Sequence, residues 1–336
     1  MPVTHAAAPQ LAIPRHIVPE APAWGQVLHS LRGQTMGTSW SVLCFGPPQL
    51  RLPVLEAALD KRLAGLVAEL SHWEPESLLC RFNALQPGET VELPPDFAAV
   101  IEAGLHVAAA SGGAFDPCMG ALVQRWGFGP PGQPGPQSRA PLQAWRELGW
   151  DAARRRLTQP GGLMLDFSAI AKGHAVDCLS RLLLELGLPH HLVEIGGELR
   201  GHGLKPEGQP WWVDVEPPAT DCDLPVLRIA LHQLSAASSG DYRRFRIDAQ
   251  GRRLSHTLDP RTGEPVAHDL ALVTVLHEHA MWADAWSTAL MVLGPEQGLA
   301  LAEAEGLVAR LVVREAGGWR QRLSSALQQL LDEEGA

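Results

Sequence analysis

One apolar run constrains the fold of this chain more than any other feature. From Met281 to Leu293 the residues are apolar and helix-forming, apart from Asp284, Ser287 and Thr288. Residues four apart on a helix lie on one face, so Asp284 and Thr288 project together, with Ser287 beside them. A carboxylate and hydroxyls on one face form a hard-oxygen site that suits a small divalent cation. The alternative is a buried helix whose hydroxyls bond back to its own carbonyls.

The length, composition and net charge of the chain limit the classes of protein to which it can belong. The 336 residues can bury a large core, in one large domain or two. Hydrophobic residues make up 46% of the chain, which is ordinary for a soluble globular protein. The net charge is −10, from 27 Lys and Arg against 37 Asp and Glu. A negative surface argues against binding to nucleic acid, but it permits an anionic small ligand at a locally positive site.

The cysteines and the two ends of the chain bear on its compartment. Five widely spaced cysteines never form a C-x-x-C pair, which argues against the common zinc and thioredoxin patterns and favours free thiols in a reducing compartment. No apolar run approaches the ~18 residues of a membrane span. The first thirty residues lack a secretory signal and are expected to form a disordered tail, as are residues 326–336. We therefore expect a cytoplasmic protein, unless a leader is missing from this chain.

Helical and extended segments follow one another without a regular alternation. Apolar spacing predicts helices over residues 52–70, 94–111, 169–186, 282–293 and 295–305. Strand-like segments cover residues 34–45, 163–168, 191–195, 211–215, 227–234, 243–247 and 272–276. This irregular mixture favours an α+β architecture over a doubly wound sheet, with one domain over residues 31–325.

The segment from Asp166 to Gly173 is a candidate phosphate site. A short strand is expected to lead into a helix that Ser168 caps, with Lys172 in its first turn. A helix N-terminus attracts anions, and a lysine in the first turn strengthens that attraction. The alternative is an ordinary capped helix with a solvated lysine.

Three further turns carry polar side chains. In Gly112–Pro117, Asp116 either caps a helix or holds the ring nitrogens or hydroxyls of a ligand. Val193–Glu198 contains a Gly-Gly pair, which marks a turn and lets a flat ring pass near the backbone. In Ser255–Gly263, His256 is either structural or a donor to a phosphate.

In order and spacing, these motifs resemble those of the FAD:protein FMN transferases, the ApbE-like flavin transferases. The resemblance runs from about Gln34 to Glu305. Its segments are Thr35–Thr38, Ser71–Ser77, Arg81–Asn83, Gly113–Pro117, Trp126–Gly129, Asp166–Gly173, Val176–Asp177, Ile195–Gly197, Ser239–Arg243, His256–Pro265 and Ala283–Thr288. It implies a mixed fold with central β-sheets packed by helices, and with FAD in a cleft between two lobes.

The resemblance also implies an activity and a set of site residues. Such enzymes bind FAD and Mg²⁺, transfer FMN to a Thr or Ser hydroxyl of a target protein and release AMP. The acceptor is usually a subunit of a membrane electron-transfer complex. The residues implied to contact FAD are Met36, Trp73, Ala114, Phe115, Asp116, Asp166, Lys172 at the pyrophosphate, and Thr257 beside His256. The implied Mg²⁺ ligands are Asp284, Thr288 and the backbone carbonyl of Ala169, with Ser287 where some relatives carry a second Asp.

The implied chemistry leaves some roles open. Attack of a hydroxyl on the FMN-side phosphorus needs charge neutralised on the pyrophosphate and on the departing AMP, and Lys172 and Mg²⁺ would supply it. The hydroxyl must also lose a proton, for which His256 or a nearby carboxylate is the candidate base. Two other functions remain open, an FAD pyrophosphatase that yields FMN and AMP, and a non-catalytic FAD carrier.

Overall fold

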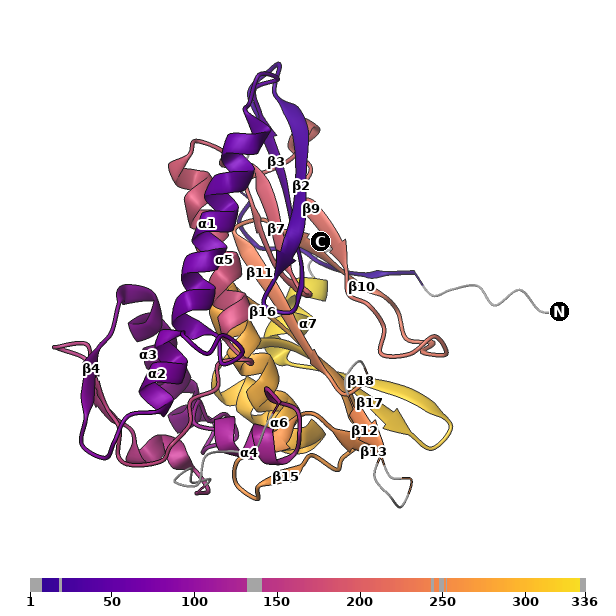
Figure 1. Cartoon of the computed structure of the whole chain (residues 1–336). Coiled ribbons are helices and arrows are strands. Elements are labelled where there is room, and N and C mark those ends of the chain that lie inside the picture. The colour runs from indigo at the N-terminus through magenta and orange to yellow at the C-terminus, as the bar shows by residue number, and fades with distance from the viewer. Residues whose placement is uncertain are drawn as a thin grey trace.

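An eight-stranded sheet runs through the centre of the protein (Figure 1). The computed structural model describes residues 8–17, 20–131, 141–242, 245–247, 251 and 253–332. From one edge of the sheet to the other, the strands are β18 (Gly318–Leu323), β17 (Val308–Glu315), β16 (Leu270–His277), β11 (Leu234–Gly240), β8 (Glu198–His202), β7 (His191–Ile195), β3 (Thr38–Gly46) and β2 (Val27–Thr35). All neighbouring strands in it are antiparallel.

Smaller sheets surround the central one. One contains β1 (Gln10–Ala12), β10 (Leu227–Leu231) and β9 (Trp211–Asp214), and another contains β4 (Thr90–Glu92), β6 (Arg156–Thr158) and β5 (Gly149–Asp151). Two hairpins pair β12 (Phe245–Ile247) with β13 (Arg253–Ser255), and β14 (Leu258–Asp259) with β15 (Glu264–Pro265).

Helices pack against the central sheet and against one another. They are α1 (Leu52–Leu70), α2 (Leu78–Asn83), α3 (Pro95–Ala110), α4 (Gly120–Arg125), α5 (Ala171–Glu185), α6 (Ala280–Ala304) and α7 (Ser325–Asp332), with short 3₁₀ turns η1 (Ala144–Glu147) and η2 (Pro206–Gly208). Helix α5 packs against α6, and α6 packs against β11 and β16 (Figure 1). This arrangement confirms the predicted mixed α+β class.

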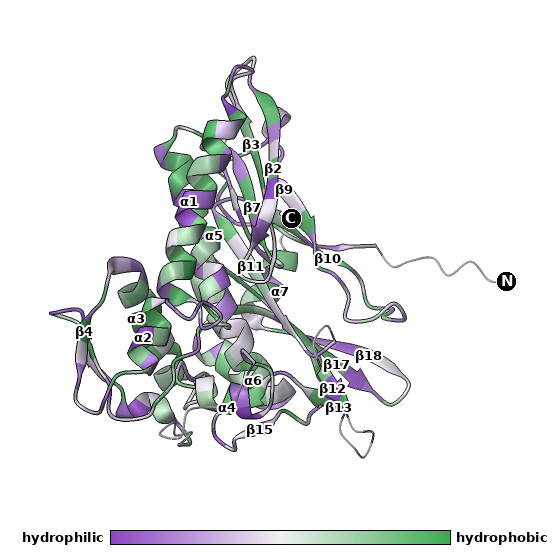
Figure 2. Cartoon of the chain, viewed as in Figure 1, coloured by the Kyte–Doolittle hydropathy of each residue, from purple (hydrophilic) through white to green (hydrophobic). Residues whose placement is uncertain are grey.

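Helix α1 follows the predicted amphipathic pattern. Its buried residues are the five leucines whose spacing predicted the helix, Leu55, Leu59, Leu63, Leu66 and Leu70. Figure 2 shows hydrophobic and hydrophilic residues alternating along this helix, as expected when one face packs on a core and the other meets solvent. Its solvent face is therefore available to form a surface beside the neighbouring strand β2.

The apolar run that begins at Met281 forms the first half of α6. Most of it is buried, because an element that is apolar on nearly all sides must be covered on nearly all sides. The two helices predicted on either side of Gly294 form one element with a break, where Gly294 has a φ of 79° and Pro295 follows. A glycine suits the left-handed conformation of this break, and Pro295 cannot continue the backbone ladder of the first half.

The structure corrects the predicted tails at both ends. Gln10–Ala12 forms β1, which pairs with β10 and buries Ala12 to 1% exposure, and β2 begins at Val27 within the predicted N-terminal tail. At the other end, Ser325–Asp332 forms α7, and Leu327 is 1% exposed in a hydrophobic cluster that includes Trp211 and Leu231. Both segments gain order by packing against distant parts of the chain, which local composition does not reveal. Residues 1–7, 18–19 and 333–336 lie outside the described part of the chain.

None of the helices in the described residues is long and apolar enough to span a membrane.

Candidate active site

A single cavity of about 690 Å³ collects nearly all the residues predicted to form the site. Residues from β2–β3, α5, α6 and the intervening loops meet in its wall. The predicted residues that line it are Met36, Trp73, Ala114, Phe115, Asp116, Asp166, Ala169, Lys172, His256, Thr257, Asp284 and Thr288. Ser287 is the exception, and it does not line the cavity. The volume is in the range of cavities that enclose an organic cofactor.

The floor of the cavity is formed where α5 and α6 approach closely. The backbone N–H of Gly173 donates a hydrogen bond to Asp284 Oδ2 at 3.0 Å, which joins the two helices. A side chain at position 173 would collide with the Ala280 carbonyl and would lie 2.8 Å from Asp284 Cβ. The glycine therefore permits the contact that fixes the Asp284 carboxylate.

We expect Gly173→Ala to destabilise the fold and to displace Asp284. The added methyl group has rigid backbone on one side, so the helices must separate, and overpacking of this kind costs about 1–3 kcal/mol. Urea unfolding of the variant measures the loss. Gly65→Ala is the control, because nothing lies within 4 Å of a Cβ at that helical position. Equal stability of the two variants would contradict the assigned contact.

Lys172 lies in the first turn of α5, as predicted, but it has a partner that the sequence did not reveal. Its Nζ lies 2.5 Å from Glu198 Oε1, in an ion pair with a carboxylate that is 3% exposed. Glu198 is the first residue of β8, directly after the Gly196–Gly197 turn. Its other oxygen, Oε2, is buried without a hydrogen-bond partner in the described structure. The Gly-Gly pair was the available signal, since it allows the backbone to turn tightly beside a ligand.

Burial weakens the acidity of the carboxylates in this region. The pKa of Glu198 is raised to about 7, chiefly by burial and also by nearby Asp284, while Lys172 opposes the shift. The pKa of Asp284 is also raised by burial, again opposed by Lys172. At neutral pH one lysine thus faces two buried acids, and a cation beside them would favour their ionised forms.

We expect Glu198→Gln to stabilise the ligand-free protein at pH 8 relative to the unmodified chain. Because the folded-state pKa of Glu198 lies above its unfolded value, the carboxyl contributes stability at low pH that is lost as the pH rises through about 7. Urea unfolding at pH 5 and pH 8 tests the expectation. A stability difference between the two chains that does not change with pH would contradict it.

The residues predicted to bind a metal fit that role in part. Asp284 and Thr288 both line the cavity, as does Ala169. At the start of α5, Ala171 N donates to the carbonyl of Phe167 and His174 N donates to the carbonyl of Ile170. Gly173 N, which would otherwise donate to the Ala169 carbonyl in a regular helix, donates to Asp284 instead. A carboxylate, a hydroxyl and a carbonyl are the oxygen ligands that Mg²⁺ prefers.

Ser287, which was predicted as a metal ligand, is engaged by hydrogen bonds within the protein. Its hydroxyl donates to the backbone carbonyl of Asp284 at 2.9 Å and lies 2.8 Å from Ser239 Oγ. Ser239 Oγ also lies 3.1 Å from Thr288 Oγ1. Ser287 therefore does not line the cavity, and its hydroxyl bonds back to its own helix, as in the alternative stated for the sequence.

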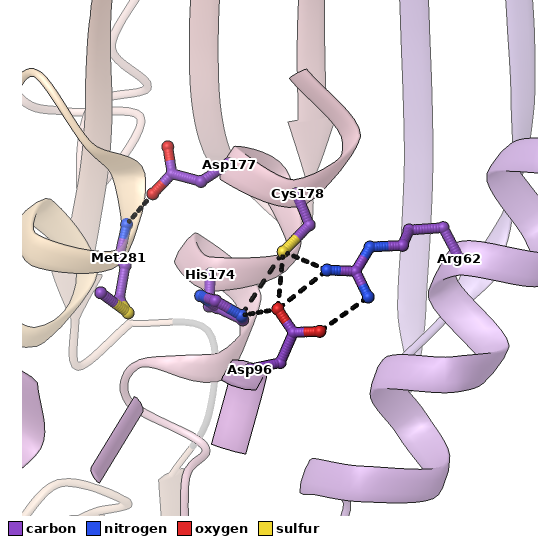
Figure 3. A network of polar contacts seen from close by, with 6 residues as sticks. All are labelled: Arg62, Asp96, His174, Asp177, Cys178 and Met281. Atoms are coloured by element: carbon purple, nitrogen blue, oxygen red, sulfur yellow. Dashed lines mark hydrogen bonds and ion pairs between the residues drawn. The ribbon is translucent and has the colours of Figure 1, made fainter. Parts of the chain in front are cut away.

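A polar network behind the cavity holds α5 and α6 in place (Figure 3). Both oxygens of Asp177 accept bonds from the start of α6, from Ala280 N at 3.0 Å and Met281 N at 2.9 Å. The carboxylate thereby satisfies backbone donors that a helix N-terminus leaves free. It fixes the first turn of α6 just ahead of Asp284.

The other half of this network joins α1, α3 and α5. Asp96 accepts two bonds from Arg62 at 2.8 Å and lies 3.0 Å from His174 Nε2, with Cys178 Sγ 3.4 Å from that ring nitrogen (Figure 3). Burial lowers the pKa of His174, but its bonds to Asp96 and Cys178 outweigh that effect and raise it to about 9. Asp96, His174 and Cys178 are close enough to hold a metal ion, but the Arg62 guanidinium already neutralises the cluster. We therefore assign the network to positioning α5.

A methionine, Met36, and a tryptophan, Trp73, both line the cavity. Met36 and Gly37 form the two-residue turn between β2 and β3, with φ of 48° and 71°. A left-handed conformation is unusual for methionine, and it fixes the side chain against the cavity. Trp73 is 56% exposed and lines the cavity, so its ring is available for stacking on a flat ligand.

The two predicted aspartates of the loops are buried in the cavity wall. Asp116 does not cap the helix that follows it, α4, whose cap position is Met119. It accepts bonds from Cys118 N at 2.8 Å and, at the start of η1, from Trp145 N at 3.2 Å, and burial raises its pKa to about 6. Asp166 Oδ1 accepts a bond from Ser168 N at 2.7 Å and lies 3.5 Å from His72 Nδ1.

Two local predictions near Asp166 are wrong. Ser168 does not cap α5, because the helix begins three residues later, at Ala171, and Ile170 occupies the cap position without a side-chain bond. The expected strand over residues 163–168 is reduced to one isolated bridge, between Met119 and Met164. The segment is a loop that Asp166 stabilises, and this loop delivers Ala169 to the cavity.

His256 and Thr257 reach the cavity from the loop before β14. The His256 ring packs edge-on to Phe128, with centroids 6.4 Å apart. The backbone of Thr257 is held by a bond from its N–H to Ser255 Oγ at 3.1 Å. Both predicted residues therefore line the same cavity as Lys172 and Asp284.

Comparison with known proteins points to one family. The model of the ApbE family matches residues 36–311. The chain is 36% identical to the FAD:protein FMN transferase of Haemophilus influenzae, over 90% of this chain and 91% of that protein. It is 32% identical to the enzyme of the same name from Klebsiella pneumoniae, over 90% and 89%.

Solved structures agree with the sequence relatives. The fold matches the apo form of Pseudomonas stutzeri flavinyl transferase ApbE with a TM-score of 0.81 and 37% identity, over 91% of this chain and 97% of that one. It matches flavin transferase ApbE from Vibrio cholerae with a TM-score of 0.80 and 30% identity, over 90% and 99%. With a family model that covers most of the chain and relatives of this similarity, the chain belongs to the ApbE family.

Proposed function

We propose that this protein transfers the FMN part of FAD to a Thr or Ser hydroxyl of an acceptor protein and releases AMP, in a Mg²⁺-dependent reaction. The observation that carries the proposal is the single chamber that brings Lys172, Asp284 and Thr288 together with an exposed tryptophan, Trp73, at its wall. One side of the chamber suits phosphate and a cation, and the other suits a flat ring. Membership of the ApbE family, whose relatives carry this activity in their names, supports it.

The cavity wall divides by chemistry in a way that suits a dinucleotide. Trp73 and Met36 offer an aromatic face and a polarisable sulfur for a ring of FAD, and Asp116 offers a buried carboxylate for ring or ribose donors. Lys172 lies at the start of α5, where the helix N-terminus also favours a phosphate. Its ammonium is held by the ion pair with the buried carboxylate of Glu198.

Asp284, Thr288 and the Ala169 carbonyl would hold Mg²⁺, which when bound supplies charge neutralisation on the phosphoryl oxygens. Other groups of the chain would position the metal ligand, neutralise charge and accept the proton. Gly173 fixes Asp284 through its N–H, and Lys172 neutralises charge that grows as the bond to AMP breaks. We assign the proton of the acceptor hydroxyl to His256, which lines the same cavity as Lys172 and Asp284.

The test uses the purified protein with FAD, Mg²⁺ and a candidate acceptor, such as the flavoprotein subunit of a membrane electron-transfer complex from the same organism. Intact-mass spectrometry of the acceptor and chromatography of released AMP are the two readouts. The proposal expects an acceptor mass gain equal to FMN, lost when its Thr or Ser is changed to Val or Ala. AMP with free FMN and no mass gain would identify an FAD pyrophosphatase. Tight FAD binding without AMP would identify a carrier.

A further inference from the structure

A second hollow lies beside the active-site cavity, between strand β2 and helix α1. It has a volume of about 730 Å³. Strand β2 contributes Arg32, Gly33, Gln34 and Thr35, the hairpin turn contributes Met36, α1 contributes Glu56, Asp60, Leu63, Ala64, Val67 and Ala68, and the following loop contributes Glu74 and Glu76. We call this hollow the β2–α1 groove. Consecutive residues of β2 line it, so the backbone of the strand borders it as well as side chains of both faces.

The backbone of β2 offers hydrogen bonds along this groove. β2 is the last strand of the eight-stranded sheet and pairs with β3 on one side, and no further strand of the described residues pairs with its other side. The two-residue turn makes Thr35 and Thr38 the bonded pair that closes the hairpin, and the bonding alternates from there. Arg32 and Gln34 therefore direct their N–H and C=O groups away from β3.

The charge of the groove favours a positive partner. Its lining holds four carboxylates, Glu56, Asp60, Glu74 and Glu76, against one guanidinium, Arg32. Within the described ranges, none of these five groups forms an ion pair with another residue. Glu56 and Asp60 also lie four apart on α1, where like charges destabilise a helix. A cationic segment in the groove would relieve this repulsion.

The groove leads to the active site. Met36 lines both the β2–α1 groove and the cavity that contains Lys172 and Asp284. An extended chain laid along the outer edge of β2 would therefore reach the cavity at the hairpin turn. The space between an edge strand and a helix is a common seat for an extended peptide, which pairs its backbone with the strand.

We propose that the β2–α1 groove binds the acceptor protein, as an extended segment that carries Lys or Arg, adds a strand to β2 and delivers its Thr or Ser hydroxyl past Met36 to the cavity. This inference rests on the proposed transfer of FMN to a protein. It adds the location and the chemistry of the acceptor's docking surface. Main-chain bonds to Arg32 and Gln34 supply affinity, and the carboxylates select the charge of the segment.

The test measures binding directly, so that it does not depend on turnover. The probe is a fluorescein-labelled, end-blocked peptide of alternating Thr and Val with two Lys residues, and its affinity is measured by fluorescence anisotropy in low salt with Mg²⁺. Replacing both Lys by Glu in the peptide should weaken binding at least about tenfold, since like charges then face each other. Methylating the backbone nitrogens of one alternating set of peptide residues should abolish binding, while methylating the other set should leave it nearly unchanged.

Variants of the protein locate the site. Glu56→Lys/Asp60→Lys should weaken binding of the Lys peptide about tenfold, and Arg32→Glu should strengthen it several-fold. The matched control is Glu102→Lys/Glu185→Lys, which makes the same change in net charge at exposed residues outside the groove. Weakening by the control to the same extent, insensitivity to backbone methylation, or no saturable binding of the Lys peptide would each overturn the proposal.

A parallel measurement separates this inference from the proposed function. AMP release from FAD without any acceptor should be the same in Glu56→Lys/Asp60→Lys as in the unmodified protein, because neither residue lines the active-site cavity. Absence of AMP release and flavinylation in every variant, with peptide binding intact, would reject the proposed function but retain the groove. Normal flavinylation with no effect of the groove variants on the acceptor's KM would reject the groove as the docking surface but retain the proposed function.

Discussion

Replacing Asp284 with Asn is expected to reduce AMP release from FAD by roughly 10²-fold or more, with the fold retained. The carboxylate is 3% exposed, faces the cavity and is the only acid on its face of α6. Asn keeps an oxygen that can accept the bond from Gly173 N, so the contact between α5 and α6 survives, whereas the negative charge that would hold Mg²⁺ is lost. Turnover across a Mg²⁺ titration, with circular dichroism of the same sample, measures both effects.

Ser287→Ala is the matched control for this variant. Ser287 is on the same helix, but its hydroxyl bonds to the Asp284 carbonyl and to Ser239 and does not line the cavity. We expect its Mg²⁺ dependence to remain close to that of the unmodified protein. Wild-type turnover in Asp284→Asn, or an equal loss in Ser287→Ala, would reject the assignment of the metal to the Asp284–Thr288 face.

Replacing Lys172 with Met is expected to lower the turnover rate at saturating FAD by about 10²-fold, while FAD affinity falls only modestly. The ammonium acts most strongly where negative charge grows, on the phosphoryl group and the departing AMP. The contacts proposed for FAD, with Trp73 and with the wall around Asp116, would not depend on the lysine. Steady-state AMP release and an FAD titration of the same variant separate the two quantities.

Lys172→Met also breaks the ion pair with Glu198, so its effect on stability must be separated from its effect on turnover. Without Lys172, the buried Glu198 carboxylate loses its counter-charge, and the protein is expected to lose stability above pH 7. Lys172→Met/Glu198→Gln should recover that stability without recovering turnover. Lys61→Met, at an exposed lysine of α1, serves as the surface control. A collapse of FAD affinity with a normal rate at saturation would make Lys172 an anchor for the ligand only.

Local sequence pattern predicted those parts of the site that are carried by one helix. The four-residue spacing of Asp284 and Thr288 predicted a shared face, and both line the cavity, because helical periodicity alone decides which side chains project together. The same periodicity placed the five leucines of α1 on its buried face. It could not exclude Ser287, whose hydroxyl is drawn to the backbone and to Ser239 on a neighbouring strand.

Contacts between distant segments were decided only by the tertiary structure. The pairing of Glu198 with Lys172, the bond from Gly173 to Asp284 and the strand formed by Gln10–Ala12 each join residues that are far apart in sequence. The β2–α1 groove likewise exists because the last strand of the sheet lies beside a helix. The sequence by itself determined the periodic faces, the turns and the family. The packing of helices on the sheet determined which of those faces meet, since burial, pKa and hydrogen-bond partners depend on neighbours that no local pattern specifies.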